Sequence, residues 1–259
     1  MRRVEIGIIG DIDVRLPIKN VENKRVGTPY GPSNNISIGG INGKNIAFLH
    51  RQNETSIVPS HKINYRANIW ALHFLGVKRI ISTSYVNSLK QDYCIGDLVI
   101  PCDFIDFTKS RLSTFYDTSP MTNINMNIPY CPNLRKKLIQ VSNQKNRNVW
   151  DNAIFVCTEG PRYETPAEIK MFKILGCDVI GKTGLPEAVL AREMEICFAS
   201  LFYVTNLASG LIDQKTVEEA SEEKIKIIPV VREVLTEVIP KISTRRNCIC
   251  SHALEGARF

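Results

Sequence analysis

Six short segments of the chain combine glycine with polar or charged side chains and could therefore carry chemistry. They are Gly10–Asp13, Arg51–Ser56, Ser82–Ser88, Thr158–Tyr163, Gly181–Glu187 and Thr205–Gly210. None of them is a P-loop or a dinucleotide-binding fingerprint, and the sequence has no G-x-S-x-G nucleophile elbow. Each segment alone is a weak indication of function, so what matters is whether the fold brings them together.

The histidines and cysteines show no metal-binding pattern. None of the four histidines (His50, His61, His73 and His252) lies at zinc-ligand spacing from a cysteine, so we expect no metal and no organic cofactor. The chain nevertheless has eight cysteines. In most cytosolic proteins such thiols stay reduced and would be core residues or ligands, with the proteins of hyperthermophiles as the exception.

Each of the six segments lies at or just after the end of a predicted strand. Strands are predicted at 4–9, 45–49, 77–83, 97–100, 153–157, 177–181 and 196–206, and helices at 64–75, 132–142, 164–175, 186–194 and 217–239. Alternating strands and helices predict an α/β, three-layer, single-domain fold with a mixed, partly parallel twisted sheet flanked by helices. In such folds ligands bind at the carboxyl ends of the strands, where the six segments lie.

Composition narrows the class of protein further. The 259 residues are 44% hydrophobic and 23% charged, which excludes a disordered chain. No apolar run approaches the ~20 residues that span a bilayer, and Asp11 and Asp13 cut short the apolar start, so we expect a cytoplasmic protein. The net charge of +7 is a weak hint of an anionic ligand or simply a solvated surface, and no nucleic-acid-binding signature is present.

Longer motifs give the strongest indication. They are GIIG (7–10), TPYGPSN (28–34), HKINYRANIWAL (61–72), FID (104–106), TEGPRYETPAE (158–168), KTGLPEAVLARE (182–193) and VTNLASG (204–210). Together they cover nearly the whole chain, which resembles the trimeric purine nucleoside phosphorylases and, within them, the methylthioadenosine and methylthioinosine phosphorylases.

The resemblance implies a reaction, a fold and partners. These enzymes cleave a purine nucleoside with phosphate as co-substrate and form no covalent intermediate. They position the reactants and stabilise the charges of an oxocarbenium-like transition state. It implies a nucleoside phosphorylase domain over 1–242, a tail over 243–259, and a homotrimer or a dimer of trimers. A neighbouring subunit would close the sugar end of the pocket near Phe115 and Tyr116.

By resemblance, the base pocket contains Tyr163, Glu164 and Asn206, followed by Leu207 and Ala208. The ring of Tyr163 would pack on the purine, while Glu164 and Asn206 act as the catalytic pair on its edge. A carboxylate accepts from N1–H of a 6-oxopurine, and an amide can donate to O6 and accept from a protonated N7. Because adenine-specific relatives carry aspartate at the Asn206 position, the pair favours inosine, guanosine or methylthioinosine over adenosine.

By resemblance, the phosphate site includes the positions of Ile12, Arg51, Gln52, Ser84 and Thr183. Arg51 offers a fork of donors, and Ser84 and Thr183 keep their hydroxyls. The family pattern is less complete elsewhere: Ile12 has no hydroxyl, Asp11 adds negative charge, and Gln52 replaces a histidine.

Lys182 also departs from the family, which has a methionine under the ribose at this position. Its place beside Thr183 suggests a compensating cation for the phosphate. If these changes abolish phosphorolysis, the chain is instead a catalytically degenerate relative that binds a nucleoside. A methylthioadenosine phosphorylase is a further alternative, and the 5′ substituent is not readable from the sequence.

The cysteines gain meaning from the same resemblance. The Cys248-Ile249-Cys250 pair resembles archaeal methylthioadenosine phosphorylases from hot environments, which carry disulfides inside the cell, so we expect a thermophilic protein. The matched positions imply a Cys131–Cys197 disulfide and a strained Cys248–Cys250 ring. The long cross-link would stabilise the fold by roughly 2–4 kcal/mol.

Overall fold

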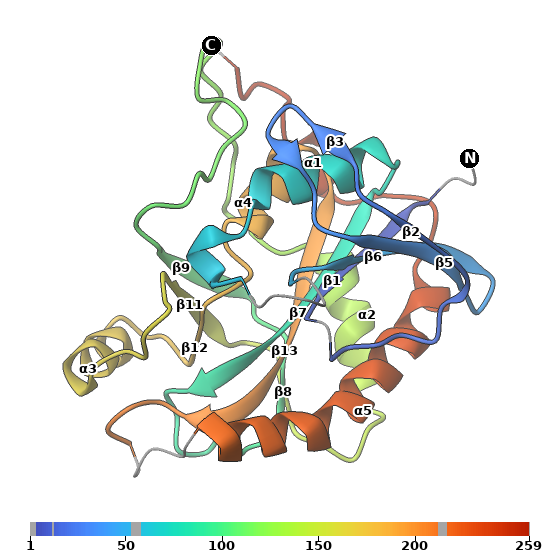
Figure 1. The fold of residues 1–259 in the computed structure, drawn as a ribbon. Helices are drawn as coiled ribbons and strands as arrows, with labels where there is room; N and C mark the ends of the chain where they lie inside the picture. Colours follow the sequence, from blue (N-terminus) through green and yellow to red (C-terminus); the bar gives the residue numbers. More distant parts are fainter. Residues whose placement is uncertain (1–3, 12, 53–57, 212–216, 259) are drawn as a thin grey trace.

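The centre of the fold is strand β1 (Ile6–Gly10), and all five of its residues are buried. The computed structural model describes residues 4–11, 13–52, 58–211 and 217–258 (Figure 1). β1 pairs in parallel with β6 (Lys44–His50) on one side and with β7 (Arg79–Ser88) on the other. Its continuous apolar run suits a parallel strand that is covered on both faces.

The sheet extends from these three strands in both directions. Beyond β7, the long strand β13 (Cys197–Leu207) continues the parallel part, and β8 (Leu98–Val99) pairs antiparallel with it. Beyond β6, β5 (Ile36–Ile41) and β2 (Lys19–Lys24) are antiparallel. The short β10 (Val149–Trp150) pairs in parallel with β8 and forms the other edge. The sheet is therefore mixed and partly parallel, as predicted.

A branch of the sheet leaves the far end of β7. There β12 (Val179–Gly181) pairs antiparallel with β7, and β11 (Ile154–Thr158) and β9 (Asp103–Phe107) follow in parallel. A separate ribbon is formed by β3 (Gly27–Thr28) and β4 (Gly31–Pro32). The branch places the carboxyl ends of β11 and β12 beside the far half of β7.

Helices cover both faces of the sheet. On one face α1 (Tyr65–Phe74) packs against α4 (Glu187–Glu193), and on the other α2 (Pro132–Ser142) packs against α5 (Val217–Lys241). Ile9 of β1 belongs to the apolar cluster on the first face and Ile8 to the cluster on the second. This alternation confirms the predicted three-layer α/β arrangement.

Three further helices complete the described part of the chain. α3 (Pro166–Ile174) covers a smaller apolar cluster beside β11 and β12. Two short 3₁₀ helices are η1 (Ser60–Lys62), before α1, and η2 (Ile249–His252), near the C-terminus. Within the described ranges, no helix combines the length and the apolar character needed to cross a bilayer.

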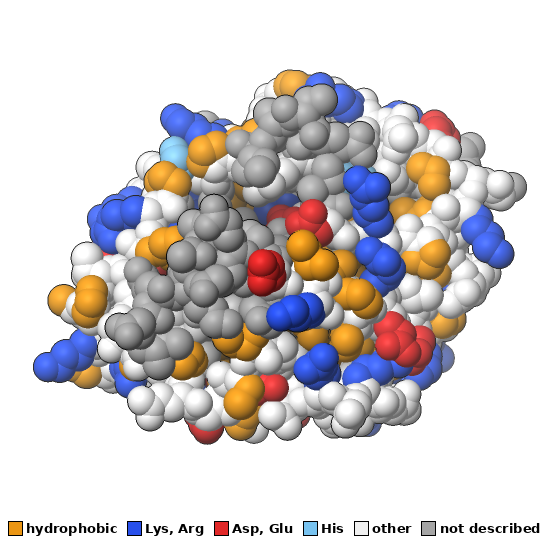
Figure 2. Space-filling view, turned by 60° about the horizontal axis from the view of Figure 1, so that its bottom comes forward, with side chains coloured by type: hydrophobic (Ala, Val, Ile, Leu, Met, Phe, Trp, Pro, Cys, Tyr) orange, Lys and Arg blue, Asp and Glu red, His pale blue; other side chains and the backbone are white. Residues whose placement is uncertain are grey.

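The basic residues do not collect on one side of the view in Figure 2. On that face, Lys and Arg side chains are interspersed with acidic and hydrophobic ones. The positive net charge is therefore spread over this part of the surface.

Candidate active site

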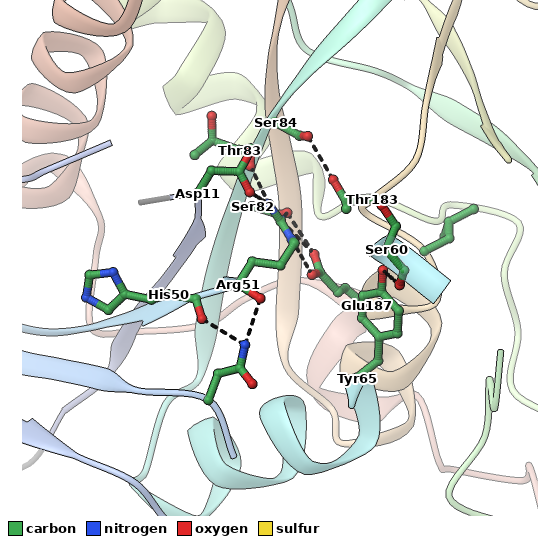
Figure 3. Close-up of polar contacts among 12 residues, drawn as sticks. Asp11, His50, Arg51, Ser60, Tyr65, Ser82, Thr83, Ser84, Thr183 and Glu187 are labelled. Carbon is green, nitrogen blue, oxygen red and sulfur yellow. Dashed lines mark hydrogen bonds and ion pairs between the residues drawn. The ribbon is translucent and has the colours of Figure 1, made fainter. Parts of the chain in front are cut away.

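Polar side chains from several strand ends converge in one place, as the sequence predicted (Figure 3). Asp11 follows β1, Arg51 follows β6, and Thr183 lies just beyond β12. Ser84 lies on the part of β7 that extends past the last residue paired with β1. Parallel strands that end at one edge bring side chains from distant parts of the sequence together there.

Arg51 is the centre of this cluster and is completely buried. Its Nε and Nη2 atoms donate to the two carboxylate oxygens of Glu187 at 2.9 and 3.1 Å. Nη1 donates to Asp11 at 3.2 Å and to the Thr83 carbonyl at 3.0 Å, and Nη2 donates to the Ser82 hydroxyl at 2.8 Å. All five N–H groups of the guanidinium therefore have protein acceptors.

The charges around Arg51 explain why it can be buried. Burial alone would lower the pKa of Arg51, but the carboxylates of Glu187 and Asp11 outweigh burial and raise the pKa. The guanidinium thus stays charged and paired. The sequence predicts that Arg51 binds phosphate. Since all its donors are already used, it can do so only if a partner such as Asp11 gives up its hydrogen bond.

Two hydroxyls stand beside this network. The side-chain oxygens of Ser84 and Thr183 are 2.7 Å apart and both residues are buried. Gln52, next to Arg51, is half-buried. Ile12 lies outside the described residues. The structure thus brings together Arg51, Ser84 and Thr183 of the predicted phosphate-site residues.

The predicted base-reading residues are both nearly buried. Glu164, 9% exposed, precedes α3, and its Oε1 accepts a 2.6 Å hydrogen bond from the Thr158 hydroxyl. Asn206, 8% exposed, lies near the end of β13, and its Oδ1 accepts from the Leu207 amide at 2.9 Å. Among the described residues, the side-chain hydrogen bonds of Glu164 and Asn206 use Oε1 and Oδ1, and none involves Glu164 Oε2 or Asn206 Nδ2. Within the described part of the chain, each side chain therefore keeps one hydrogen-bonding atom that a ligand could use.

A capping box fixes the residue after Glu164. The Thr165 hydroxyl accepts from the Glu168 amide, while the Glu168 carboxylate accepts from the Thr165 amide at 2.8 Å. Arg162 donates to both oxygens of Glu168. This pairing lowers the pKa of Glu168 to about 2, chiefly because Arg162 hydrogen-bonds to the carboxylate. The start of α3, and with it Glu164, is thereby held in place.

Lys182 faces the side of the site where the sequence predicts the base. Its stem packs on Gly160, its Nζ donates to the Pro161 carbonyl at 3.1 Å, and Nζ lies 4.2 Å from the centre of the Tyr163 ring. Burial lowers the pKa of Lys182, and Glu164 partly opposes this shift. The ammonium is bonded within the 160–163 loop, so the structure gives no support to its predicted role as a phosphate cation.

Tyr163 and Ala208 complete the predicted base-site residues. Tyr163 is 46% exposed, which leaves its side chain accessible to a stacking partner. Ala208 is buried in the apolar cluster under α3, and its amide donates to Ser88. Ala208 therefore supports the wall of the site from beneath.

Two residues central to the site were not predicted from the sequence. Glu187 is the two-point partner of Arg51, and the signal was its place four residues after Thr183 in the same motif. Arg111 lies in a loop without any motif. It donates to the carbonyls of Thr158 and Leu185 at 2.9 and 2.6 Å, and its guanidinium lies over the Tyr65 ring.

The cysteines differ from the prediction. All eight are free thiols in this structure, so neither the Cys131–Cys197 nor the Cys248–Cys250 disulfide is formed. The sulfurs of these four residues lie within 4.8 Å of one another, and the Cys197 and Cys248 sulfurs are 3.3 Å apart. A disulfide requires about 2.05 Å. The four sulfurs thus form one cluster and no bonded pair.

Comparison with known proteins agrees with this geometry. Residues 5–240 match the model of the Phosphorylase superfamily, and the chain belongs to that superfamily. It is 46% identical to the probable 6-oxopurine nucleoside phosphorylase of Dictyoglomus turgidum, over 98% of both chains. It is 45% identical to the probable S-methyl-5'-thioinosine phosphorylase of Methanothermobacter thermautotrophicus, over 97% of this chain and 89% of that one.

A solved structure extends the comparison to the fold. The crystal structure of a methylthioadenosine phosphorylase from an antarctic soil metagenomic library matches with a TM-score of 0.95 and 32% identity. The match covers all of this chain and 93% of the other. The fold expected from the sequence motifs is therefore confirmed.

Proposed function

We propose that this protein is a purine nucleoside phosphorylase for 6-oxopurine nucleosides: inosine, guanosine or methylthioinosine. It would transfer the sugar to phosphate, giving the free base and ribose 1-phosphate or methylthioribose 1-phosphate. The observation that carries the proposal is the pair of nearly buried side chains Glu164 and Asn206, each with one hydrogen-bonding atom left for a ligand.

The chemistry of the pair suits a purine leaving group. Glu164 Oε2 would accept from N1–H, while Asn206 Nδ2 would donate to O6. As the glycosidic bond breaks, negative charge develops on the purine, and these groups, with Asn206 accepting from a protonated N7, would stabilise it. Tyr163 would stack on the base, with Lys182 and Leu207 beside it. No covalent intermediate and no cofactor are required.

The phosphate would bind beside Ser84 and Thr183, whose hydroxyls are already 2.7 Å apart. Arg51 would join them when Asp11 releases Nη1, and Gln52 would add a neutral hydrogen bond. In this proposal the anion takes the place of one carboxylate partner of Arg51, so the guanidinium stays paired throughout.

The named relatives favour the same reaction but differ in substrate. Their names include a 6-oxopurine, a methylthioinosine and a methylthioadenosine phosphorylase. The test is release of base from inosine, methylthioinosine and methylthioadenosine, with and without phosphate. We expect phosphate-dependent release of hypoxanthine and little adenine. Adenine release as fast as hypoxanthine release would contradict the 6-oxopurine assignment, and no phosphate-dependent release from any of them would leave a nucleoside-binding relative.

We further propose a homotrimer or a dimer of trimers, in which Phe115 and Tyr116 lie near a neighbouring active site. Within one chain Phe115 already packs on Tyr30, with ring centres 5.3 Å apart, and its amide donates to Glu193. Light scattering tests the assembly, and a monomer would contradict it.

A further inference from the structure

Four cysteine sulfurs meet at one point on the side of the molecule formed by α2, α5 and the C-terminal tail. Cys131 is the N-cap residue of α2 and Cys197 is the first residue of β13. Cys248 and Cys250 lie at the start of η2. The four Sγ atoms lie within 4.8 Å of one another, although the residues come from three distant segments.

The spacing of the sulfurs fits a metal centre. Zinc binds four thiolates tetrahedrally at about 2.3 Å, which places neighbouring sulfurs about 3.8 Å apart. The Cys197 and Cys248 sulfurs are 3.3 Å apart, and the longest separation in the group is no more than 4.8 Å. Small rotations of the side chains would thus bring all four sulfurs to bonding distance of one ion.

The surroundings suit a negatively charged tetrathiolate. A hollow of about 320 Å³ opens beside Cys131, Cys197 and Cys248, and six of its eleven other lining residues are basic. These six are Arg79, Lys136, Lys137, Lys241, Arg245 and Arg246. Zinc with four thiolates carries two negative charges, which these cations would offset. Cys131 also lies at the N-terminus of α2, where the helix dipole favours a thiolate.

We propose that Cys131, Cys197, Cys248 and Cys250 bind one zinc ion in a structural tetrathiolate site. Three of the four are buried and all four would be protein ligands, which is the closed arrangement of a structural zinc rather than a catalytic one. Binding replaces the thiol protons by the metal, involves no oxidation, and gives the sulfurs a common partner. The sequence analysis singled out these four cysteines, but their spacing from 131 to 250 matches no zinc-ligand motif, so a metal site was not predicted.

The site would hold the C-terminal tail in place. From η2 the chain runs to Ala257, whose carbonyl accepts from the Asn123 amide at 2.8 Å, and Arg258 forms a bridge with Thr122. In Figure 1 this red tail runs beside the green loop that contains these partners. A zinc ion at the start of the tail would thus hold it against residues 122–123 and help to position the loop that also contains Phe115.

The test measures metal and thiols in the full-length protein. We expect about one zinc per chain by elemental analysis after purification without chelators. We also expect eight reactive thiols after denaturation with EDTA. Cobalt(II) in place of zinc should give the intense visible bands of tetrahedral thiolate coordination. Less than about a tenth of an equivalent of zinc, with no cobalt spectrum on titration, would overturn the proposal. Fewer than eight thiols in metal-free protein would instead establish the disulfides predicted from the sequence.

A matched pair of variants assigns the ligands. Cys248→Ser removes a half-buried member of the cluster, and Cys102→Ser removes a half-buried cysteine outside it. We expect the first variant to lose zinc at least tenfold faster to a chelator, and the second to retain it like the wild type. Equal retention by both would overturn the assignment. The cobalt spectrum of the wild type keeps the test decisive even if a variant fails to fold.

Discussion

The carboxylate of Glu187 grips the guanidinium of Arg51 at two points, with Nε–Oε1 and Nη2–Oε2 distances of 2.9 and 3.1 Å. The two side chains are 3% and 0% exposed. The pair joins the first residue of α4 to the end of β6, so a helix on one face of the sheet fixes a cation at the strand ends. Because of this ion pair, the stability of the fold depends on the charges of Arg51 and Glu187.

Glu187→Ala should destabilise the protein strongly, because it leaves the buried Arg51 charge with Asp11 alone. Loss of one partner of a buried ion pair typically costs about 3–5 kcal/mol. Chemical denaturation measures this change. Glu233→Ala is the control, because Glu233 is an exposed partner of Lys145, which keeps Glu237. We expect the control to lose less than about 1 kcal/mol. If both variants lost a similar free energy of unfolding, the buried Arg51–Glu187 pair would contribute no more to stability than an exposed one.

Asp11→Asn should improve phosphate binding. Asp11 occupies Arg51 Nη1 and places a negative charge beside the proposed anion site. Replacing the charged acceptor by a neutral one weakens its interaction with Arg51 by about 1.5 kcal/mol. Since phosphate competes for the same donor, we expect the phosphate KM to fall about tenfold. Steady-state kinetics with varied phosphate measures the change. Asp13→Asn, at an exposed neighbour, should leave the phosphate KM as it is. A raised or unchanged KM in Asp11→Asn would show that Asp11 does not compete with phosphate.

Asn206→Asp should shift the preference from 6-oxopurine toward 6-aminopurine nucleosides. An aspartate cannot donate to O6 but can accept from a 6-amino group. A site discriminates strongly against a substrate that leaves its buried polar groups unpaired. We expect the ratio of kcat/KM for methylthioinosine over methylthioadenosine to fall at least about a hundredfold. If both substrates lose activity equally, Asn206 stabilises the transition state without selecting the base.

Acid should weaken the start of α3 through Glu168. The folded-state pKa of Glu168, about 2, lies below its ordinary value of 4.5, so the carboxylate stabilises the fold fully above pH 4.5. That contribution is lost as the pH falls from 4.5 toward about 2. Glu168→Gln should therefore be less stable than the wild type by about 1 kcal/mol at pH 7.

The difference between the two proteins should shrink as the pH is lowered through this range, which denaturation at several pH values would reveal. Because Arg162 is mostly exposed, salt should reduce the difference at neutral pH as well. A difference that does not change with pH would assign the effect to packing and not to the carboxylate charge.

Most of the architecture could be predicted from the sequence because its signals are local. The helix at 132–142 was predicted with the bounds it has in the structure, and β1, β6, α1 and β13 were each placed to within a few residues. β2 and β5 were missed. The side chains of β2 are almost all exposed and polar, and the two central glycines of β5 interrupt its apolar run. Neither strand has an apolar face that a short sequence window can recognise.

The site was less predictable, because its partners are set by three-dimensional contacts. The motifs located Arg51, Ser84 and Thr183 correctly at one edge of the sheet, but they gave no sign that Asp11 and Glu187 satisfy the guanidinium. The direction of Lys182 depends on the Pro161 carbonyl, which only the folded 160–163 loop presents. The cysteine cluster likewise depends on where the tail returns to the sheet.

Arg111 has a consequence for how the two substrates affect one another. Its guanidinium donates to the carbonyl of Thr158, at the proposed base side, and to that of Leu185, two residues past Thr183, at the proposed phosphate side. A ligand that displaces the segment of Thr158 or that of Leu185 therefore also affects the other segment, because Arg111 is hydrogen-bonded to both. We expect the purine and phosphate affinities to be thermodynamically coupled, and linkage requires the coupling to be reciprocal: each substrate changes the affinity for the other by the same factor.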